Sequence, residues 1–508
     1  MTLRASDRMR YAAIAALTAI EFLQLSMTAF AAGPLMGELG LTPEDFSLIA
    51  SVYASVAILM ISIERWLVER LGGRLVILCA TTISMSGSIL CATSTGFGSF
   101  LFGRVVMAIG GGALFTSARM IIHHELAGPR RFTGIRALGT SLALSIAAGP
   151  WIAAEAVSME TWSAIYWLVA GIGALTFVLA GLTLSPIPID PASRHAPQPA
   201  QQILLAGGSF VLLYALGRYN YDFFSRAGLL LSLAALGTGG LLAYLWLQHR
   251  TARPLLRVRP MLHMRYLAGL GLFGFGYLML GANNYMIPAM LQRTLGFGWA
   301  TVGRIEALGL LVAVVTFRVV TRLLPRHPAP RKYLVTGFAA LALFGLLLSR
   351  LNAAADLWHD VLPALALYSV FLLTVLPVAA MQTFREMEQD EPAFANAQQL
   401  KNMLGQAGIA LGIAMATLGQ QWRTAVHYAV LNNRFIPGDP AYDAVLHSLR
   451  DGLARTVGPI DAAPMAVARV AQLLAQQAAL LANLDHFLVI AALGVLGIGV
   501  TLVQRVFR

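Results

Sequence analysis

Two residues of opposite charge lie deep inside apolar segments of this chain. Glu21 is near the middle of the first apolar segment, and Arg104 is inside the fourth. An arginine near the centre of a bilayer costs at least about 2.5 kcal/mol, so we expect Arg104 to face a cavity or a partner, with snorkelling to the membrane surface as the alternative. Burial disfavours a charged carboxylate and a nearby cation favours it. We therefore interpret Glu21 as the counter-charge of Arg104 and as a group that can load and release a proton.

Further polar residues lie at or near the ends of apolar segments. Glu155 closes the fifth segment and is either a second proton-coupling residue or part of a solvated edge. Arg304 and Glu306 begin the tenth segment, where they either pair across a cavity mouth or sit at the membrane interface. Amides and aromatic rings suit an amphipathic ligand, with core packing as the alternative. On that basis four residues of the ninth segment are predicted to line a substrate cavity: Tyr277, Asn283, Asn284 and Tyr285.

The composition requires a membrane around these residues. Of 508 residues, 57% are hydrophobic and 12% charged, and the mean hydropathy is +0.69, which leaves too little polar surface for a soluble protein. A spanning helix needs roughly 20 apolar residues. Segments of this kind predict fourteen spans: Tyr11–Leu35, Phe46–Ile63, Leu75–Ser94, Phe100–Ile122, Ala137–Glu155, Trp162–Leu182, Ile203–Leu216, Ala227–Leu247, Tyr266–Met290, Thr301–Thr321, Leu334–Leu348, Val361–Phe384, Asn402–Leu418 and Phe487–Val506. The seventh is short, so spans seven and eight could form a re-entrant hairpin, which would leave twelve crossings. The fold class is an all-α polytopic membrane protein.

The basic residues orient these spans. Of the 36 Lys and Arg residues, 25 fall at one side of the predicted spans, including Lys401, and this side is predicted to be cytoplasmic with both chain termini. The formal charge of +12 therefore reflects orientation, and nucleic acid is not an expected partner.

Cys79 and Cys91 are about 18 Å apart along one helix, too far for a disulfide. His123 and His124 have no further ligand nearby, so neither a metal nor a cofactor is expected.

The chain divides into three predicted parts. Residues 1–185 form a six-helix bundle, 186–265 a linker with two additional spans, and 266–508 a second six-helix bundle with a long outer loop at 420–486. A Pro-rich stretch after the sixth span marks the first boundary. Apolar residues at helical spacing between Val467 and Leu484 predict an amphipathic helix that lies on the membrane or meets a partner.

The short segment after the second span carries a charge pattern of its own. Glu69 and Arg70 lie beside Gly72 and Arg74, which suits an ion-paired inner gate next to a tight turn. With Leu67, these residues resemble the G-x-L-a-D-r-x-G-r-k signature of the major facilitator superfamily. The chain departs from that signature with Arg65 at the first glycine and with glutamate at the aspartate position.

Two further segments strengthen the resemblance. The stretch from Arg104 to Gly112 is similar to the R-x-x-q-G-x-g segment of the superfamily, and 145–154 is similar to the G-x-x-x-G-P-x-x-G-G element of its antiporters. Gly149 and Pro150 of that element permit a helix kink and a close approach between helices, with ordinary packing as the alternative. With fourteen spans, the chain resembles the fourteen-helix drug:proton antiporter family.

The resemblance implies a major facilitator fold of two six-helix bundles plus two helices, and proton-coupled export of amphipathic drugs or organic compounds by alternating access. It implies a bacterial inner membrane, with lipid, a small-molecule substrate, protons and a periplasmic adaptor protein as partners. The family carries an aspartate in an L-D-x-T pattern where this chain has Leu23-Gln24-Leu25-Ser26, and Glu21 one turn earlier is the candidate substitute.

The missing aspartate leaves two other functions open. A dedicated carrier for one metabolite, such as a siderophore or an organic acid, is the first alternative, and a non-transporting membrane sensor is the second. The chain has no nucleotide loop of the G-x-x-x-x-G-K-[ST] type, which argues against ATP-driven transport, and an enzyme is not expected.

Overall fold

The computed structural model describes residues 5–185, 197–251, 254–387, 389–434 and 440–507. All regular elements in these ranges are helices, as predicted. They are α1 (Ala5–Phe30), α2 (Ala32–Glu38), α3 (Pro43–Leu71), α4 (Gly73–Ala92), α5 (Phe97–Gly111), α6 (Leu114–Glu125), α7 (Pro129–Ser158), α8 (Ala164–Thr183), α9 (Pro199–Arg250), η2 (Arg259–Met261), α10 (Met264–Pro288), η3 (Ala289–Thr294), α11 (Trp299–Leu323), α12 (Pro330–Leu348), η4 (Leu357–Val361), α13 (Leu362–Phe384), η5 (Arg385–Met387), α14 (Glu391–Arg434), α15 (Pro440–Val457) and α16 (Pro459–Val503).

Fourteen helical stretches in the described ranges are long and apolar enough to cross a membrane, which agrees with the predicted number of spans. The uncertain seventh and eighth spans both belong to α9, which kinks at Arg226. They occupy Pro199–Tyr219 and Tyr221–Arg250, with 21 and 30 residues, so each has the length of a full crossing. The seventh helix is longer than its predicted span because it begins in the polar residues before Ile203.

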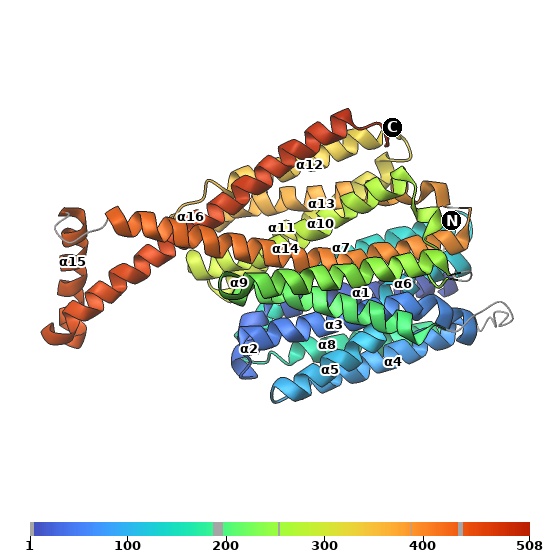
Figure 1. Ribbon diagram of the computed structural model, residues 1–508, viewed down its shortest axis with the longest axis horizontal. Helices are drawn as coiled ribbons and strands as arrows, with labels where there is room; N and C mark the ends of the chain where they lie inside the picture. Colours follow the sequence, from blue (N-terminus) through green and yellow to red (C-terminus); the bar gives the residue numbers. More distant parts are fainter. Residues whose placement is uncertain (1–4, 186–196, 252–253, 388, 435–439, 508) are drawn as a thin grey trace.

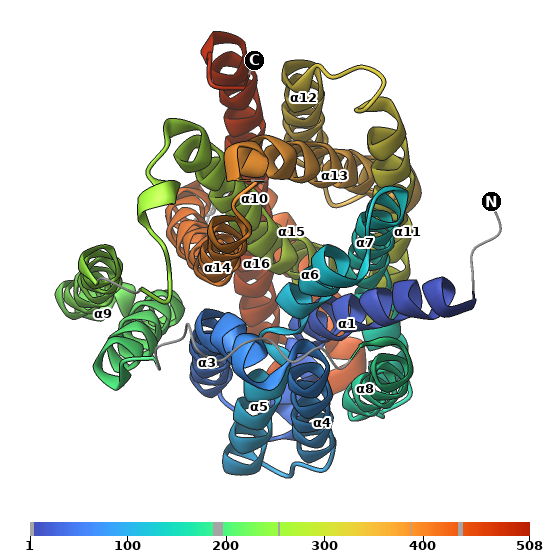
Figure 2. The same cartoon turned by 90° about the vertical axis from the view of Figure 1, so that its right-hand side faces the viewer.

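The helices form two halves that face each other, α1–α8 in one half and α10–α14 with α16 in the other (Figure 2). α9 lies at the side and packs against α3 and α14. α1 begins and α16 ends at the same end of the bundle, called here the terminal end (Figure 1). The opposite end carries a projecting hairpin of α14, α15 and α16, so we call it the stalk end. The linker residues Pro186, Pro188 and Pro191 lie outside the described residues, and the predicted three-part division stays a prediction.

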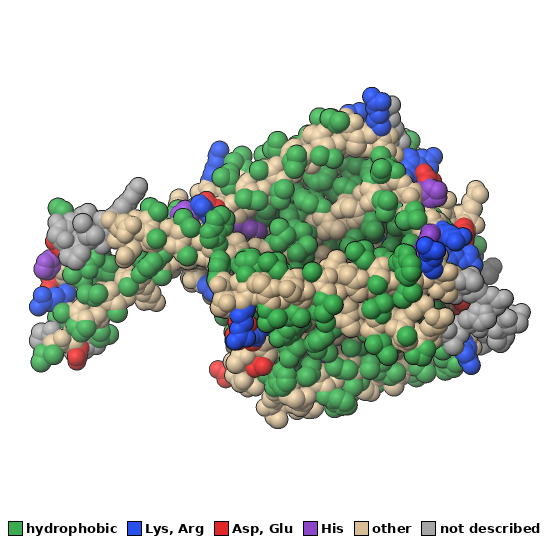
Figure 3. Space-filling model, in the orientation of Figure 1, with side chains coloured by type: hydrophobic (Ala, Val, Ile, Leu, Met, Phe, Trp, Pro, Cys, Tyr) green, Lys and Arg blue, Asp and Glu red, His purple; other side chains and the backbone are tan. Residues whose placement is uncertain are grey.

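The outer surface of the bundle fits a lipid environment. The face in Figure 3 is mostly apolar between its two ends, and charged side chains gather towards those ends. Large apolar side chains such as Leu182, Ile203 and Trp246 point outward with more than half of their surface exposed. An apolar surface this extensive would be unstable in water, whereas acyl chains solvate it and leave the backbone bonds inside the helices.

The segment predicted to be the inner gate is mostly helical, because α3 continues past the predicted end of the second span at Ile63. α3 begins with a capping box in which the Thr42 hydroxyl accepts from the Asp45 amide at 3.1 Å, and it continues to Leu71. The turn is confined to Gly72, whose φ of +87° favours glycine, and α4 begins at Gly73. Glu69 and Arg70 therefore lie on the last turn of a helix. The rotation of that helix from residue to residue sets the directions in which their side chains point.

The outer loop predicted at 420–486 is a helical hairpin. α14 contains 44 residues, about 66 Å of helix, whereas the hydrocarbon core is about 30 Å thick. Its second half therefore projects from the bundle beside α16, and α15 lies across the tip (Figure 1). The predicted amphipathic helix belongs to α16, where Val470 and Leu480 are buried in the hairpin. It projects away from the bundle, so the interpretation as a helix flat on the membrane is wrong.

Close packing of α10 on α14 gives a stability prediction. A Cβ placed on Gly281 would lie 2.1 Å from the Ile409 carbonyl oxygen, whereas a Cβ on Gly271 of the same helix would meet nothing within 4 Å. Because the obstacle is backbone, Gly281→Ala is expected to destabilise the protein by about 1–3 kcal/mol. Thermal unfolding of the purified protein in detergent should show a lower Tm for Gly281→Ala and no comparable loss for Gly271→Ala. Equal melting of the two variants would contradict the close packing.

Candidate functional site

Arg104 lies at the centre of a buried polar cluster in the first half. The Arg104 Nη1 donates to Gln24 Oε1 at 2.7 Å, and the Gln24 Nε2 donates to the Tyr53 hydroxyl at 2.8 Å. The guanidinium also lies 4.1 Å from the centre of the Tyr53 ring, a cation–π contact. α5, α1 and α3 each contribute one of these residues. Arg104 is only 5% exposed, so the alternative that it snorkels to the membrane surface is wrong.

Glu21 lies one helical turn before Gln24 and is 7% exposed. Among the described residues it forms no ion pair with Arg104, and its Oε2 has no hydrogen-bond partner. Arg104 bonds directly to the neutral amide of Gln24, so its interaction with Glu21 is electrostatic and not a direct contact. A buried carboxyl without a bonded partner is costly when ionised. Glu21 thus stands one turn from the residue that bonds Arg104 and has one buried carboxyl oxygen without a bonded partner among the described residues.

The second half contains a buried polar pair of its own. Asn283 of α10 is fully buried and Glu306 of α11 is 7% exposed. Within the described part of the chain, neither amide atom of Asn283 nor the Oε1 of Glu306 has a hydrogen-bond partner. Both residues line a cavity of about 20 Å³ with Asn284, and Ile146 of the first half closes it. The space suffices for one water molecule, whereas a drug-sized ligand needs roughly 300–1,000 Å³. This cavity is therefore too small for a substrate in this conformation.

The four residues predicted to line one substrate cavity separate into different places. Asn283 and Asn284 line the central cavity. The ring of Tyr277 stacks on Phe273 with the ring centres 6.3 Å apart. Tyr285 donates through its hydroxyl to Gln420 Oε1 at 3.3 Å, near the base of the stalk.

The predicted inner-gate residues lie at the terminal end, where three of them contact neighbours on α3 and α8. Glu69 accepts from the Arg65 Nε at 2.8 Å, and Arg70 lies 5.4 Å from the centre of the Trp66 ring. The Arg74 Nη2 donates to the Gly181 carbonyl at 2.7 Å and so joins α4 to α8.

Other residues connect the two halves at this end. The Arg65 Nη1 donates to the Pro392 carbonyl at 2.8 Å, and the Gln399 Nε2 donates to the Ile61 carbonyl at 2.8 Å. Both contacts join α3 to α14. Arg65 stands where the family signature has its first glycine, so this departure from the signature supplies a contact between the halves.

Gln399 offers a test of this closure. A single neutral hydrogen bond contributes about 1 kcal/mol, so Gln399→Ala is expected to raise the population that is open at the terminal end about fivefold. Spin labels at the exposed positions Leu71 and Lys332, in a protein with both natural cysteines replaced, would report the distance between the halves. A larger fraction of long distances is the expected result, and Asn352→Ala at the opposite end is the control. An unchanged distance distribution would contradict a closing role for Gln399.

A different contact joins the halves at the stalk end. The Arg304 Nη2 lies 2.7 Å from Glu155 Oε1, and their side chains are 60% and 30% exposed. Arg304 thus pairs with Glu155 of α7, whereas pairing across a cavity mouth with Glu306 was one of two alternatives from the sequence. An exposed pair of this kind contributes at most about 1 kcal/mol. Glu155 is therefore positioned as a contact between the halves, away from the buried clusters.

The predicted antiporter helix packs against both halves. Pro150 lies inside the unbroken α7. A Cβ on Gly149 would lie 2.3 Å from Ser26 Oγ of α1, and a Cβ on Gly303 of α11 would lie 2.6 Å from the Pro150 carbonyl oxygen. Side chains are thus excluded at the two places where α7 touches its own half and the opposite one.

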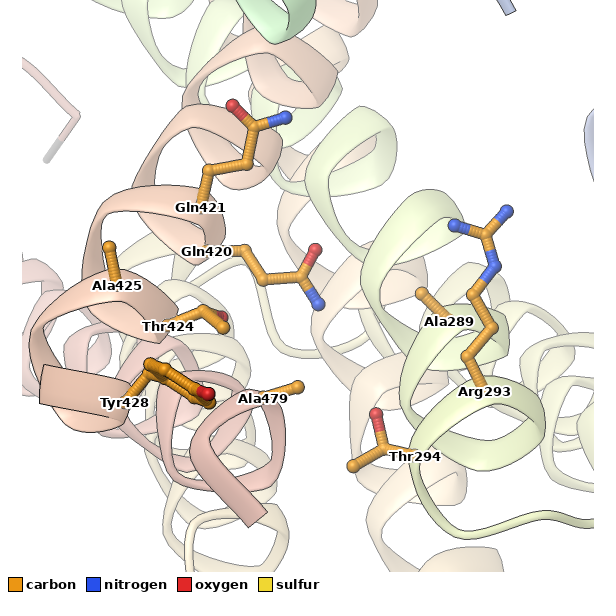
Figure 4. Close-up of a pocket in the computed structure, with 9 residues that line it drawn as sticks. All are labelled: Ala289, Arg293, Thr294, Gln420, Gln421, Thr424, Ala425, Tyr428 and Ala479. Carbon is orange, nitrogen blue, oxygen red and sulfur yellow. The ribbon is translucent and has the colours of Figure 1, made fainter. Parts of the chain in front are cut away.

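A second, larger cavity of about 480 Å³ lies at the base of the stalk, between η3, α14 and α16. Gln420 and Tyr428 of α14 face Ala289 and Thr294 across this space (Figure 4). Gln420 donates to Asn483 Oδ1 at 2.6 Å, and Asn483 donates to Thr294 Oγ1 at 3.1 Å. These bonds tie the stalk to the membrane helices.

Glu64 and Lys401 are buried ionisable residues that the sequence analysis did not identify as candidates. Glu64 is 2% exposed and accepts from the Ser117 hydroxyl at 2.5 Å, and Lys401 is 1% exposed within α14. Glu64 follows the predicted end of the second span, and Lys401 precedes the predicted start of the thirteenth. The prediction that Lys401 belongs to a cytoplasmic segment is wrong. An apolar window cannot detect such residues, because the helices continue past it.

Fourteen spanning helices in two halves, with charged groups buried among them, are the architecture of a secondary transporter. The family model described as Major Facilitator Superfamily matches residues 14–413, and the chain belongs to this superfamily. It is a membrane transporter and not an enzyme.

Known relatives and solved structures agree. The chain is 25% identical over 391 residues to the putative multidrug resistance protein MdtD of Cronobacter sakazakii. The matched region covers 76% of this chain and 80% of the relative. The structure also resembles that reported in "Structural insights into substrate recognition in proton dependent oligopeptide transporters", with a TM-score of 0.57, 15% identity and 97% of both chains covered. A crystal structure of the human organic anion transporter MFSD10 matches with a TM-score of 0.53 and 14% identity over 98% of this chain and all of that one.

Proposed function

We propose that this protein exports amphipathic organic molecules from a bacterial cell in exchange for protons. The observation that carries the proposal is Glu21, a buried carboxyl with an unbonded oxygen beside the cluster of Arg104, Gln24 and Tyr53. A group in this position can bind a proton on one side of the membrane and release it on the other when the cavity changes sides. Arg104 favours release, because its charge stabilises the carboxylate. The relative named as a putative multidrug resistance protein supports the substrate class.

Alternating access then assigns roles to the contacts between the halves. Arg65 and Gln399 close the terminal end, and Glu155 with Arg304 closes the stalk end. Glu69 holds Arg65 in place, and Arg70, Gly72 and Arg74 complete the inner-gate region around it. Pro150 lies where the backbone of α7 meets Gly303 of α11, and Gly149 lets α7 pack closely on α1. Asn283, Asn284 and Glu306 would contact the substrate once the central cavity widens.

The proposed orientation places the terminal end in the cytoplasm, because most basic residues gather there. The bacterial relative supports a location in the inner membrane. In a bacterium with two membranes the stalk would then project into the periplasm. The antiporter resemblance implies a periplasmic adaptor, and the stalk is the surface that such a partner would meet first.

Transport into proteoliposomes tests the proposal. Purified protein would receive an imposed pH gradient, and accumulation of an amphipathic fluorescent dye would be followed with and without a protonophore. Gradient-dependent accumulation that the protonophore abolishes is the expected result. Accumulation that is the same with and without the pH gradient would contradict the proposed coupling to protons.

A dedicated carrier for one metabolite is the second candidate, and Gln24 is the observation that favours it. A neutral amide occupies the place of the aspartate that related antiporters carry, and it bonds Arg104 directly. A panel of unrelated cations, anions and uncharged dyes separates the two functions. Broad competition for transport supports an exporter of many compounds, and inhibition by one chemical class alone supports the metabolite carrier.

A further inference from the structure

A second group of buried charge lies between the halves, nearer the terminal end than Glu21 and Arg104. It consists of Lys401 of α14 and Arg119 of α6, so each half contributes one cation. The proposed proton pathway uses neither residue. Lys401 is 1% exposed although lysine is rarely buried without a partner.

The surroundings of Lys401 are aromatic. Its Nζ lies 5.6 Å from the centre of the Phe115 ring and 5.1 Å from the centre of the Phe273 ring. The Arg119 guanidinium lies 4.6 Å from the same Phe115 ring. The two basic side chains therefore both contact the Phe115 ring, and Phe273 on α10 adds a second ring beside Lys401.

Neither cation has an acidic partner in the described part of the chain. Arg119 donates to the Gln398 side-chain oxygen, a neutral acceptor. Among the described residues, Lys401 contacts two aromatic rings and has no hydrogen-bonded acceptor. The buried carboxylate of the neighbouring α3, Glu64, accepts from the Ser117 hydroxyl and pairs with neither cation. Two basic side chains are thus held together without an acidic partner among the described residues, and an anion that joins them when the site opens would compensate a charge on both.

We propose that Arg119 and Lys401 bind the acidic group of an amphipathic substrate, while its aromatic part lies against Phe115 and Phe273. This inference rests on the proposed export function and narrows its substrate class to molecules with a carboxylate, sulfonate or phosphate group. When α14 moves away from α3 and α6, the two cations line the same opening on the side from which an exporter collects its substrate. The acidic group then replaces water around both cations, and the rings supply the apolar contact.

A matched pair of dyes tests the inference by binding alone. Anilinonaphthalene sulfonate and unsulfonated anilinonaphthalene share one aromatic skeleton and differ in the anionic group. Equilibrium dialysis against the full chain in nanodiscs of phosphatidylcholine, with empty nanodiscs subtracted, would give both dissociation constants. Lys401→Gln and Arg119→Gln are each expected to weaken sulfonate binding roughly tenfold or more, because each removes a charged hydrogen-bond donor. Binding of the unsulfonated dye should change less than about twofold.

Controls separate a binding role from a structural one. Lys401→Arg keeps the charge and should retain most of the sulfonate affinity. Lys332→Gln removes the other lysine, which is exposed on α12, and should change neither constant. Equal weakening of both dyes, or no preference of the parent for the sulfonate, would overturn the proposal. Loss of sulfonate binding on addition of phosphatidylglycerol would reassign the site to a lipid headgroup and overturn it too.

The same variants distinguish this inference from the proposed function. If the parent binds the sulfonate selectively but shows no gradient-driven flux, the export function fails and the anion site stands. If gradient-driven flux is present and Lys401→Gln leaves dye selectivity unchanged, the anion site fails and the export function stands. A melting temperature within a few degrees of the parent would show that each variant is folded.

Discussion

Replacing Glu21 by Gln is expected to reduce gradient-driven accumulation of substrate by about 100-fold, the scale of a lost proton-transfer group. The amide has almost the same shape but cannot release a proton. Exchange of labelled for unlabelled substrate without a gradient should persist, because the bonds from Arg104 to Gln24 and from Gln24 to Tyr53 do not involve Glu21. Proteoliposomes that contain the parent or the variant at equal density would measure both fluxes.

Glu38→Gln is the matched control for this loss. Glu38 ends the short helix α2 at the stalk end and is exposed, so its replacement removes a carboxylate without touching a buried cluster. It should transport like the parent. If Glu21→Gln keeps the full response to the gradient, the carboxyl of Glu21 does not carry the proton, and the coupling group must be sought elsewhere, with Glu306 as the next buried carboxyl.

The fold was predictable from the sequence because lipid imposes a strict rule. Every backbone polar group in the bilayer must bond within its own helix, so length and hydropathy alone mark the spans. Even the doubtful pair around Arg226 follows this rule, since both parts of α9 have the length to cross. Fourteen predicted spans and fourteen candidate helices agree for that physical reason.

Partners across the bundle were not predictable in the same way. Arg104 was expected to meet Glu21, yet Gln24 on the same helix face bonds it, and a side-chain rotamer decides between residues one turn apart. Arg65 bonds to Pro392, which is more than 300 positions away in the sequence. The spacing of residue types along the sequence carries no information about such a contact. Lys401 was assigned to a loop because a hydropathy window ends where charge appears, although α14 begins ten residues earlier.

The stalk shows a further limit. Polar residues at 420–486 excluded a span but did not distinguish an irregular loop from helices that continue into water. Packing decides this, because α14 and α16 bury apolar residues such as Val470 and Leu480 against each other outside the lipid. Buried bonds at the base, from Gln420 to Asn483 and from Asn483 to Thr294, then fix the direction of the hairpin.

Moving the acid by one turn is expected to restore coupling. In the Glu21→Gln protein, the second change Gln24→Glu should raise gradient-driven accumulation at least about tenfold above that of the single variant. The new carboxylate would accept from the Arg104 Nη1, which now bonds the amide oxygen at 2.7 Å, and such a bond is stronger when the acceptor is charged. The Tyr53 hydroxyl, which now accepts from Gln24, can rotate to donate to the same carboxylate.

The control for this rescue is Gln24→Met in the same Glu21→Gln background, which keeps the side-chain length without an acid and should stay near background. Both double variants need a melting temperature near that of the parent, because Arg104 must retain its place in the cluster. A folded protein with Glu at position 24 that still ignores the gradient would show that an acid beside Arg104 is insufficient. The acid would then have to stand at position 21. The idea that an acid at position 21 and the family's aspartate at position 24 are interchangeable would be wrong. Rescue would instead show that proximity to Arg104 matters more than the position of the acid along α1.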